Sequence, residues 1–96
     1  MPELFHASPS GNRASISVSG LRGGSGVLGH GVYFVFSEGD AHDVGRGRCG
    51  LPYDIWRVSC SQQQIRETGK YTSRISMALV DDTFTKGPRL VYAGSR

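Results

Sequence analysis

Glycine is the residue that most limits what this chain can fold into. It accounts for 14 of the 96 residues, about twice its usual share of roughly 7%. Each glycine inside a helix costs about 1 kcal/mol relative to alanine, so this composition excludes a bundle of long helices. The chain is also short for two domains, since one domain takes roughly 100–200 residues. We therefore expect residues 1–96 to form a single domain built from short elements.

The strand signals begin directly after a glycine-rich stretch. Residues 22–31 contain five glycines, which predicts a flexible loop. Residues 32–36 are five consecutive β-branched or aromatic residues, and an uninterrupted run of this kind indicates a strand buried on both faces. Further strands are expected at residues 3–8, 53–60 and 89–93, with strand character at both ends of residues 70–80. Connecting segments are expected at residues 61–68 and 81–88.

Two short helices are expected between these strands. In residues 12–19 the apolar residues alternate, which by itself favours a strand. Capping residues before this segment and Gly20 after it favour a helix, on which Leu21 would pack back. In residues 37–48 acidic residues come first and arginines last, as the helix dipole prefers, and Ser37 is a suitable N-cap.

The order of these elements indicates an α+β fold. Helices separate the strands only in the first half of the chain, so a doubly wound parallel sheet is not expected. In residues 53–60 polar and apolar side chains alternate, which points Trp56 and Val58 inward. The expected core residues are Leu4, Ile16, Val32, Phe34, Phe36, Trp56, Val58 and Val91.

The charge and the apolar pattern narrow the class of protein. Lysine and arginine number 11 against 8 acidic residues, a net charge of +3, and nine of the 11 are arginine. Arginine suits phosphate because its donors form a planar fork, so a nucleotide or a polyanion is a permitted partner. No apolar run approaches the roughly 20 residues of a membrane span, and no signal peptide is recognisable, so we expect a cytoplasmic protein without a membrane partner.

The sequence offers little support for a metal site or a phosphate loop. Cys49 and Cys60 do not form a Cys-x-x-Cys pair, and we expect both to be free thiols. The histidines at positions 6, 30 and 42 do not have the spacing of a zinc site. The glycine-rich stretch lacks the Gly-x-x-x-x-Gly-Lys-Ser/Thr pattern of a P-loop.

Three short motifs, in this order, carry a resemblance to a known family. They are LFHAS at residues 4–8, SGL at residues 19–21 and GVYF at residues 31–34, with the glycine-rich stretch before the last. The pattern resembles the ADP-ribosyltransferase superfamily, and within it the histidine–tyrosine branch that includes the poly(ADP-ribose) polymerases and diphtheria-type toxins. The resemblance covers residues 3–42, and beyond them only the order of strands is similar.

The resemblance implies a small split antiparallel two-sheet fold around a cleft that holds NAD. The implied activity is transfer of a single ADP-ribose unit to a protein or nucleic-acid acceptor, with release of nicotinamide. By the family pattern His6 bonds a ribose hydroxyl, the backbone of Ala7 holds the nicotinamide amide, and Ser8 lies beside it. Tyr33 stacks on the nicotinamide ring, for which the face of an aromatic ring is a suitable surface.

The remaining implied contacts come from flanking residues. Arg13 or Arg22 would bind the pyrophosphate, and Ser37 and Ala41 follow the tyrosine strand and line the same site. The glycine-rich stretch would lie over the substrate. Because this chain is a minimal version of the fold, a homodimer is one way of completing the site.

The family's third residue is a glutamate at the start of a later strand. The matching place here is near residues 69–72 and holds no acid. Lys70 would put a positive charge beside the developing oxocarbenium-like cation, which is the wrong sign. Glu67 is the nearest acid and is the expected third catalytic residue if the strand boundary differs by a few residues.

Three alternatives stay open at this point. A cleft without a catalytic acid would bind NAD, ADP-ribose or another nucleotide without turnover. An RNA 2′-phosphotransferase shares the fold but relies on an Arg-His-Arg-Arg set, for which Arg57 and Arg74, both expected in the later strands, are the candidates here. In the third alternative His6 and Tyr33 are merely packed, and the chain is a small partner-binding domain.

Overall fold

The computed structural model describes residues 3–21, 23–60, 62–81 and 90–96. The strands are β1 (Glu3–Pro9), β2 (Gly24–Gly26), β3 (Gly29–Val35), β4 (Tyr53–Ser59), β5 (Ile65–Lys70), β6 (Ser76–Val80) and β7 (Leu90–Ser95). The α-helices are α1 (Arg13–Ser19) and α2 (Glu38–Val44). Short 3₁₀ turns at Ser10–Asn12 and Gln62–Gln64 and a π-helical turn at Gly45–Cys49 complete the elements.

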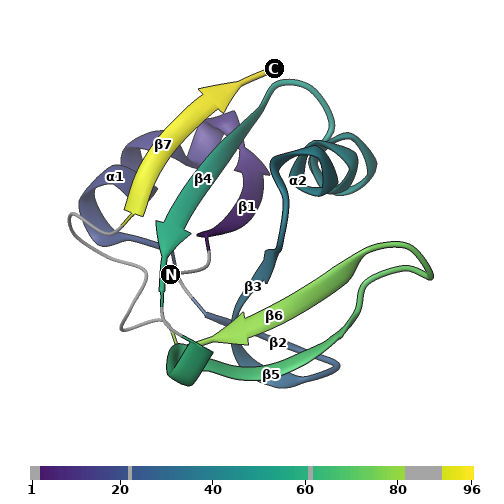
Figure 1. The fold of residues 1–96 in the computed structure, drawn as a ribbon. Coiled ribbons are helices and arrows are strands. Elements are labelled where there is room, and N and C mark those ends of the chain that lie inside the picture. The colour runs from purple at the N-terminus through teal and green to yellow at the C-terminus, as the bar shows by residue number, and fades with distance from the viewer. Residues whose placement is uncertain (1–2, 22, 61, 82–89) are drawn as a thin grey trace.

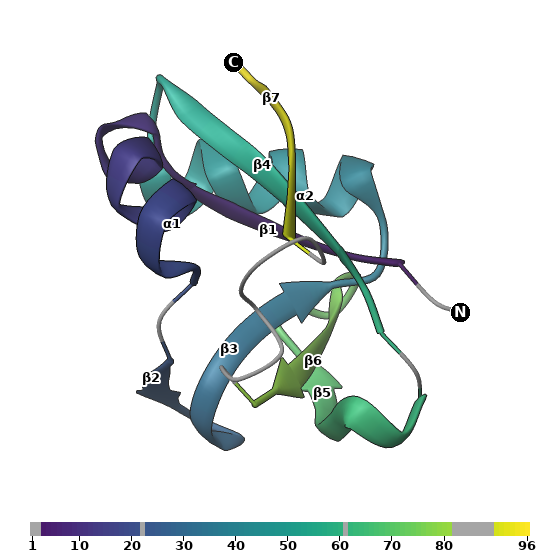
Figure 2. The same cartoon turned by 90° about the vertical axis from the view of Figure 1, so that its left-hand side faces the viewer.

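The seven strands form one antiparallel sheet, and the α+β class is confirmed. The strand order is β5-β6-β3-β1-β4-β7, and β2 pairs with β3 beside this path. Figure 1 shows β1, β4 and β7 in the upper part of the molecule, and the other strands below them. The join between the two parts is thin, because β1 and β3 pair only at Phe5 and Val35, whereas β1 and β4 pair along their full length. Figure 2 shows how far the two parts diverge.

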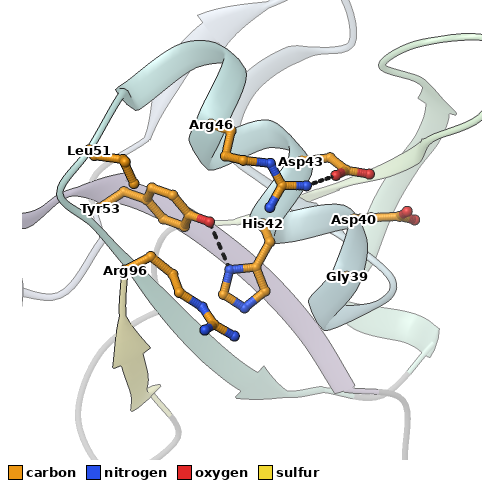
Figure 3. Close-up of a pocket in the computed structure, with 8 residues that line it drawn as sticks. All are labelled: Gly39, Asp40, His42, Asp43, Arg46, Leu51, Tyr53 and Arg96. Carbon is orange, nitrogen blue, oxygen red and sulfur yellow. Dashed lines mark hydrogen bonds and ion pairs between the residues drawn. The ribbon is translucent and has the colours of Figure 1, made fainter.

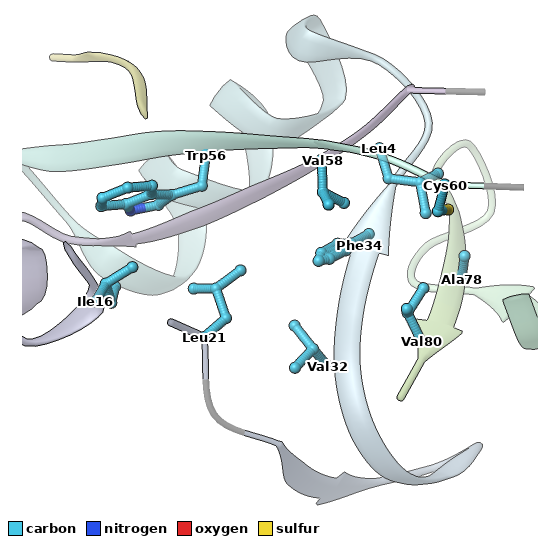
Figure 4. Packing of buried hydrophobic residues seen from close by; sticks show 10 residues of the cluster. All are labelled: Leu4, Ile16, Leu21, Val32, Phe34, Trp56, Val58, Cys60, Ala78 and Val80. Carbon is cyan, nitrogen blue, oxygen red and sulfur yellow. The ribbon is translucent and has the colours of Figure 1, made fainter. Parts of the chain in front are cut away.

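The larger core cluster fills the space between the two halves of the sheet. Figure 4 shows Val58 pointing towards Phe34 of β3, while the ring of Trp56 extends to the side of Ile16. The cluster consists of Leu4, Ile16, Leu21, Val32, Phe34, Trp56, Val58, Cys60, Ala78 and Val80. It contains six of the eight expected core residues.

The other two expected core residues are partly exposed, so this part of the prediction is wrong. Phe36 is 40% exposed because it lies beyond Val35 and Met77, the last paired residues of β3 and β6. Val91 is 38% exposed because β7 is an edge strand with one strand neighbour. Strand composition predicts burial well only where another layer covers the strand.

A second cluster lies under α2, on the other face of β1 and β4. Its buried members are Val35, Ala41, Tyr53, Ile55 and Ile75. The side chain of Ser37 accepts a hydrogen bond of 3.1 Å from the backbone nitrogen of Asp40, so the predicted N-cap of this helix is confirmed. Neither α1 nor α2, each of seven residues, is long and apolar enough to cross a membrane, and the same is true wherever the chain is described.

The first helix resolves an ambiguity of the sequence. Despite the alternating apolar residues, α1 is helical and buries only Ile16. Gly20 follows with a φ of 77°, and its backbone nitrogen donates to the carbonyl of Ile16 over 2.8 Å. Leu21 is buried in the same cluster as Ile16, in agreement with the prediction that it packs back on this helix. The positive φ explains why glycine suits the end of this helix.

Two segments expected to be loops contain strands. Within residues 22–31, β2 pairs with the beginning of β3, so this stretch is a glycine-rich hairpin. Within residues 61–68, β5 begins at Ile65 and pairs with β6. Both strands are mostly exposed, and such strands lack the hydrophobic alternation that marks a half-buried strand. The expected loop at 81–88 lies outside the described residues except for Asp81.

Candidate functional site

His6 and Tyr33 come together where the two halves of the sheet separate. The Nδ1 atom of His6 lies 2.7 Å from the backbone carbonyl oxygen of Tyr33, 27 residues along the chain. Because a carbonyl oxygen only accepts, Nδ1 carries the proton and donates this bond. The Nε2 atom of the neutral ring is then an acceptor. Burial lowers the pKa of His6 below its ordinary value of 6.5, and the charge of Arg48 lowers it further.

The imidazole of His6 and the phenol of Tyr33 do not lie on the same side of β3. The imidazole meets the ring of Phe34 edge-on, with the ring centres 5.7 Å apart. Neighbouring residues of a strand point to opposite faces, so the phenol of Tyr33 lies on the other face from Phe34. The two motif residues are therefore joined through the backbone of Tyr33 rather than through their side chains.

The phenol of Tyr33 is held by the turn between β2 and β3. Its hydroxyl donates to the carbonyl of Gly29 over 2.6 Å and accepts from the backbone nitrogen of Leu28 over 3.0 Å. The ring also lies against Gly26, where a Cβ atom would stand 2.6 Å from the ring carbon Cζ. Glycine at position 26 is thus required for this contact, and the turn covers the phenol.

Glu67 lies in the same cross-strand row as Tyr33. Tyr33 of β3 pairs with Leu79 of β6, which pairs with Glu67 of β5. Direct partners across antiparallel strands have their side chains on one face, so Tyr33 and Glu67 share a face at two strand spacings, roughly 10 Å. Lys70 is three residues further along β5, which puts it on the opposite face. Its Nζ donates to Ser76 Oγ over 3.1 Å.

The other residues on β1 and next to or within α2 that were expected to contact NAD have contacts within the protein itself. The hydroxyl of Ser8 is buried and accepts a bond of 3.1 Å from Trp56 Nε1. Ala7 is partly buried against the second core cluster, and Ala41 is fully buried within it. Ser37 is exposed, with its hydroxyl on the backbone nitrogen of Asp40.

Arg13 is engaged by a buried carboxylate. Its Nε and one terminal nitrogen each donate to Asp54 over 2.8 Å, and Asp54 is fully buried. Ser10 Oγ donates to the same carboxylate over 2.8 Å, and the guanidinium lies 5.0 Å from the centre of the Tyr92 ring. The bonds from Arg13 are the main reason that the pKa of Asp54 falls below its usual range. Arg22, the other arginine expected at the pyrophosphate, lies outside the described residues.

The two arginines considered for a phosphotransferase set have different surroundings. Arg57 on β4 pairs with Glu3 over 3.2 Å. Arg74 lies in the turn between β5 and β6. The prediction that it lies in a strand is therefore wrong. Within the described ranges, no three histidine, cysteine or acidic side chains are grouped as metal ligands.

Two cavities were not anticipated from the sequence. One, of about 640 Å³, lies between α2 and the ends of β4 and β7, where His42 Nδ1 is 2.9 Å from the hydroxyl of Tyr53 and Arg96 lies close by (Figure 3). The other, of about 570 Å³, lies between Phe36 and the hairpin of β5 and β6. We call it the Phe36 pocket. Each brings together residues from distant segments, so no local motif reveals it, and neither is lined by His6 or Tyr33.

No protein-family model, curated protein or solved structure matches this chain.

Proposed function

We propose that this chain is a NAD-binding, ADP-ribosyltransferase-like protein that transfers one ADP-ribose unit to a macromolecular acceptor and releases nicotinamide. The observation that carries the proposal is the hydrogen bond from His6 to the carbonyl of Tyr33, at the point where the sheet divides. It joins the side chain of His6 to the backbone of Tyr33, whose phenol lies on the opposite face of β3. A NAD molecule that contacts both side chains would therefore span the edge of β3 where β1 diverges from it. The single paired position between β1 and β3 also supports the proposal, although the strands form one sheet and not the two sheets that the resemblance implies.

His6 has the protonation state that the proposed contact needs. With the proton on Nδ1, the Nε2 atom offers a lone pair to a hydroxyl of the NAD ribose. Burial keeps the imidazole neutral because it lowers the pKa of His6. A protonated ring would offer a second donor instead of an acceptor, and would repel the positive charge of the nicotinamide.

Tyr33 would stack on the nicotinamide once the turn between β2 and β3 moves. The partly cationic nicotinamide ring suits the electron-rich face of the phenol. In the closed arrangement the two hydrogen bonds to Leu28 and Gly29 hold the turn over the phenol. The glycines of this turn allow it to change conformation with little steric hindrance. Binding of NAD is therefore coupled to opening of this hairpin.

Glu67 is the acid that best fits the third role. In the reaction, the bond between the ribose C1 atom and the nicotinamide nitrogen breaks, and its electron pair leaves with nicotinamide. The acceptor then bonds to C1 and loses a proton. A carboxylate on the face of Tyr33 would stabilise the positive charge that develops on the ribose. Lys70 points to the other face, so its charge does not oppose this step.

One observation favours the alternative of binding without turnover. Leu79 lies between Tyr33 and Glu67 in the row, which leaves the two side chains about two strand spacings apart. If NAD does not bridge this separation, the protein is a NAD or ADP-ribose binding module. The distinction is an experimental one, because binding and nicotinamide release are measured separately.

The test is a calorimetric titration with NAD together with an assay of nicotinamide release. We expect binding that Tyr33→Ala weakens more than tenfold while the protein stays folded. Release of nicotinamide that Glu67→Gln removes supports the transferase, and binding without release supports the binding module. The transferase and the binding module are both refuted if NAD does not bind. They are also refuted if Tyr33→Ala destabilises the fold and leaves the affinity of the folded protein for NAD unchanged.

A further inference from the structure

The Phe36 pocket combines an exposed aromatic ring with hydroxyl and charged side chains. It is formed by Phe36, Asp40, Thr68, Lys70, Arg74 and Ser76. Phe36 is 40% exposed, so part of its ring is open to a ligand. The volume of about 570 Å³ is in the range of sites for small molecules and nucleotides. It lies at the end of β3, the strand that carries Tyr33, and on the turn that follows β5, the strand that carries Glu67.

The charge of this pocket favours an anion. Lys70 and Arg74 supply two cations against the single carboxylate of Asp40. Among the described residues neither cation forms an ion pair with a carboxylate. Lys70 donates one bond to Ser76 Oγ, which leaves two of its three N–H groups for a ligand. The pocket thus contains N–H donors without a partner among the residues that the structure describes.

The positive charge continues along the edge of the sheet. β5 is the edge strand of its half, so its outer side has no strand neighbour among the described residues and can pair with a partner. Arg66 lies four residues before Lys70, about 13 Å along an extended strand. Tyr71, which directly follows Lys70, is 37% exposed. Glu67 points to the opposite face from Lys70, so the carboxylate on this side is that of Asp40 at the pocket.

We propose that the Phe36 pocket and the edge of β5 bind a single-stranded nucleic acid, and that this strand is the acceptor. The inference rests on the proposed transferase function. Phe36 would stack on an unpaired base, while Lys70 and Arg74 bind the adjacent phosphates. Acidic protein segments would use the cations but leave the exposed aromatic faces without a role. A duplex has its bases paired and stacked, so it does not offer one to Phe36.

The experiment measures binding of a fluorescein-labelled oligothymidylate of 12 nucleotides by anisotropy, without NAD. We expect Phe36→Ala to weaken binding at least fivefold, the lower end of what one lost stack costs. We expect Lys70→Gln and Arg74→Gln each to weaken binding and to reduce the salt slope of log K by about 0.7. Matched controls are Leu51→Ala and Arg46→Gln, which change an exposed apolar and a cationic residue at the other cavity.

The outcomes separate this inference from the proposed function. The nucleic-acid site is refuted if the oligonucleotide does not bind. It is also refuted if the control substitutions weaken binding as much as the pocket substitutions do. The same holds if a labelled polyglutamate binds and the oligonucleotide does not. A protein that binds NAD without the oligonucleotide refutes only this inference. If the protein binds the oligonucleotide at this pocket but does not bind NAD, the nucleic-acid site is supported and its role as an acceptor site is refuted. Thermal melts of all variants confirm that they are folded.

Discussion

The imidazole of His6 is fixed by the backbone of Tyr33, through a hydrogen bond of 2.7 Å from Nδ1 to the carbonyl oxygen. The bond lies beside Phe5 and Val35, the pair that joins the two halves of the sheet. It sets both the tautomer and the orientation of the ring. His6 therefore has a structural role as well as the proposed role in binding, and the two have different readouts.

The structural role of His6 predicts a pH dependence of stability. Burial lowers the pKa of His6 in the folded state, so the unfolded chain binds the proton more readily. The contribution of the neutral ring is complete above the ordinary pKa of 6.5 and is lost as the pH falls towards the folded value. We expect the free energy of unfolding to fall below pH 6.5 more steeply in the wild type than in His6→Gln. Urea titrations over this range test it, and parallel curves would contradict it.

The turn over Tyr33 predicts opposite effects of two substitutions. Tyr33→Phe keeps the ring but loses the hydrogen bonds to Leu28 and Gly29, so the hairpin opens more readily. Its affinity for NAD should equal or exceed that of the wild type, whereas that of Tyr33→Ala falls more than tenfold. Calorimetry with NAD measures both. A loss of affinity in Tyr33→Phe as large as in Tyr33→Ala would show that the hydroxyl, and not the ring face, matters.

The different faces of β5 predict different effects of its two charged residues. Glu67→Gln should lower kcat for hydrolysis of NAD by about 100-fold or more, with little change in KM, because the carboxylate acts on the transition state. Lys70→Gln, which alters the opposite face, should leave this rate unchanged. The assay uses NAD and water alone, so that acceptor binding does not enter. Equal effects of the two variants would contradict the assignment by register.

Because Arg13 pairs with the buried carboxylate of Asp54, we expect Arg13 to contribute to the stability of the fold. Arg13→Ala leaves this carboxylate inside the protein without its main partner. Loss of one partner of a buried ion pair is strongly destabilising. We expect the melting temperature at pH 7 to fall by at least about 5 °C. Because the pKa of Asp54 is lowered in the fold, the contribution of the pair is present above pH 3.8 and is lost in stronger acid. Arg57→Ala, which breaks the exposed pair with Glu3, is the control and should change little.

The parts of the fold that sequence reasoning predicted are those with strong local signals. Ser37 is an N-cap because its hydroxyl bonds a backbone nitrogen three residues on, and such bonds depend on neighbouring residues alone. Gly20 ends the first helix for a similarly local reason. The exposure of Phe36 and the strand character of β5 depend instead on which elements cover or pair with them. No pattern within those segments contains that information.

The candidate site shows the same division. The motifs around His6 and Tyr33 are visible in the sequence, but the fact that a backbone carbonyl joins them is not. The face of the sheet on which Glu67 lies depends on the pairing of β5 with β6, and the register of this pairing shifts between Ile65 and Glu67. An irregularity of this kind alters which residues share a face, and it is not readable from composition.

The most direct measurement is a titration with NAD followed by the ¹⁵N resonances of the histidine rings. The chain has three histidines, at positions 6, 30 and 42, so the spectrum is simple to assign. The account predicts that the Nε2 resonance of His6 shifts in a saturable manner as it accepts a bond from the ribose, while that of His42 stays unchanged. Saturable shifts elsewhere with no change at His6, or no shift at all, would contradict it.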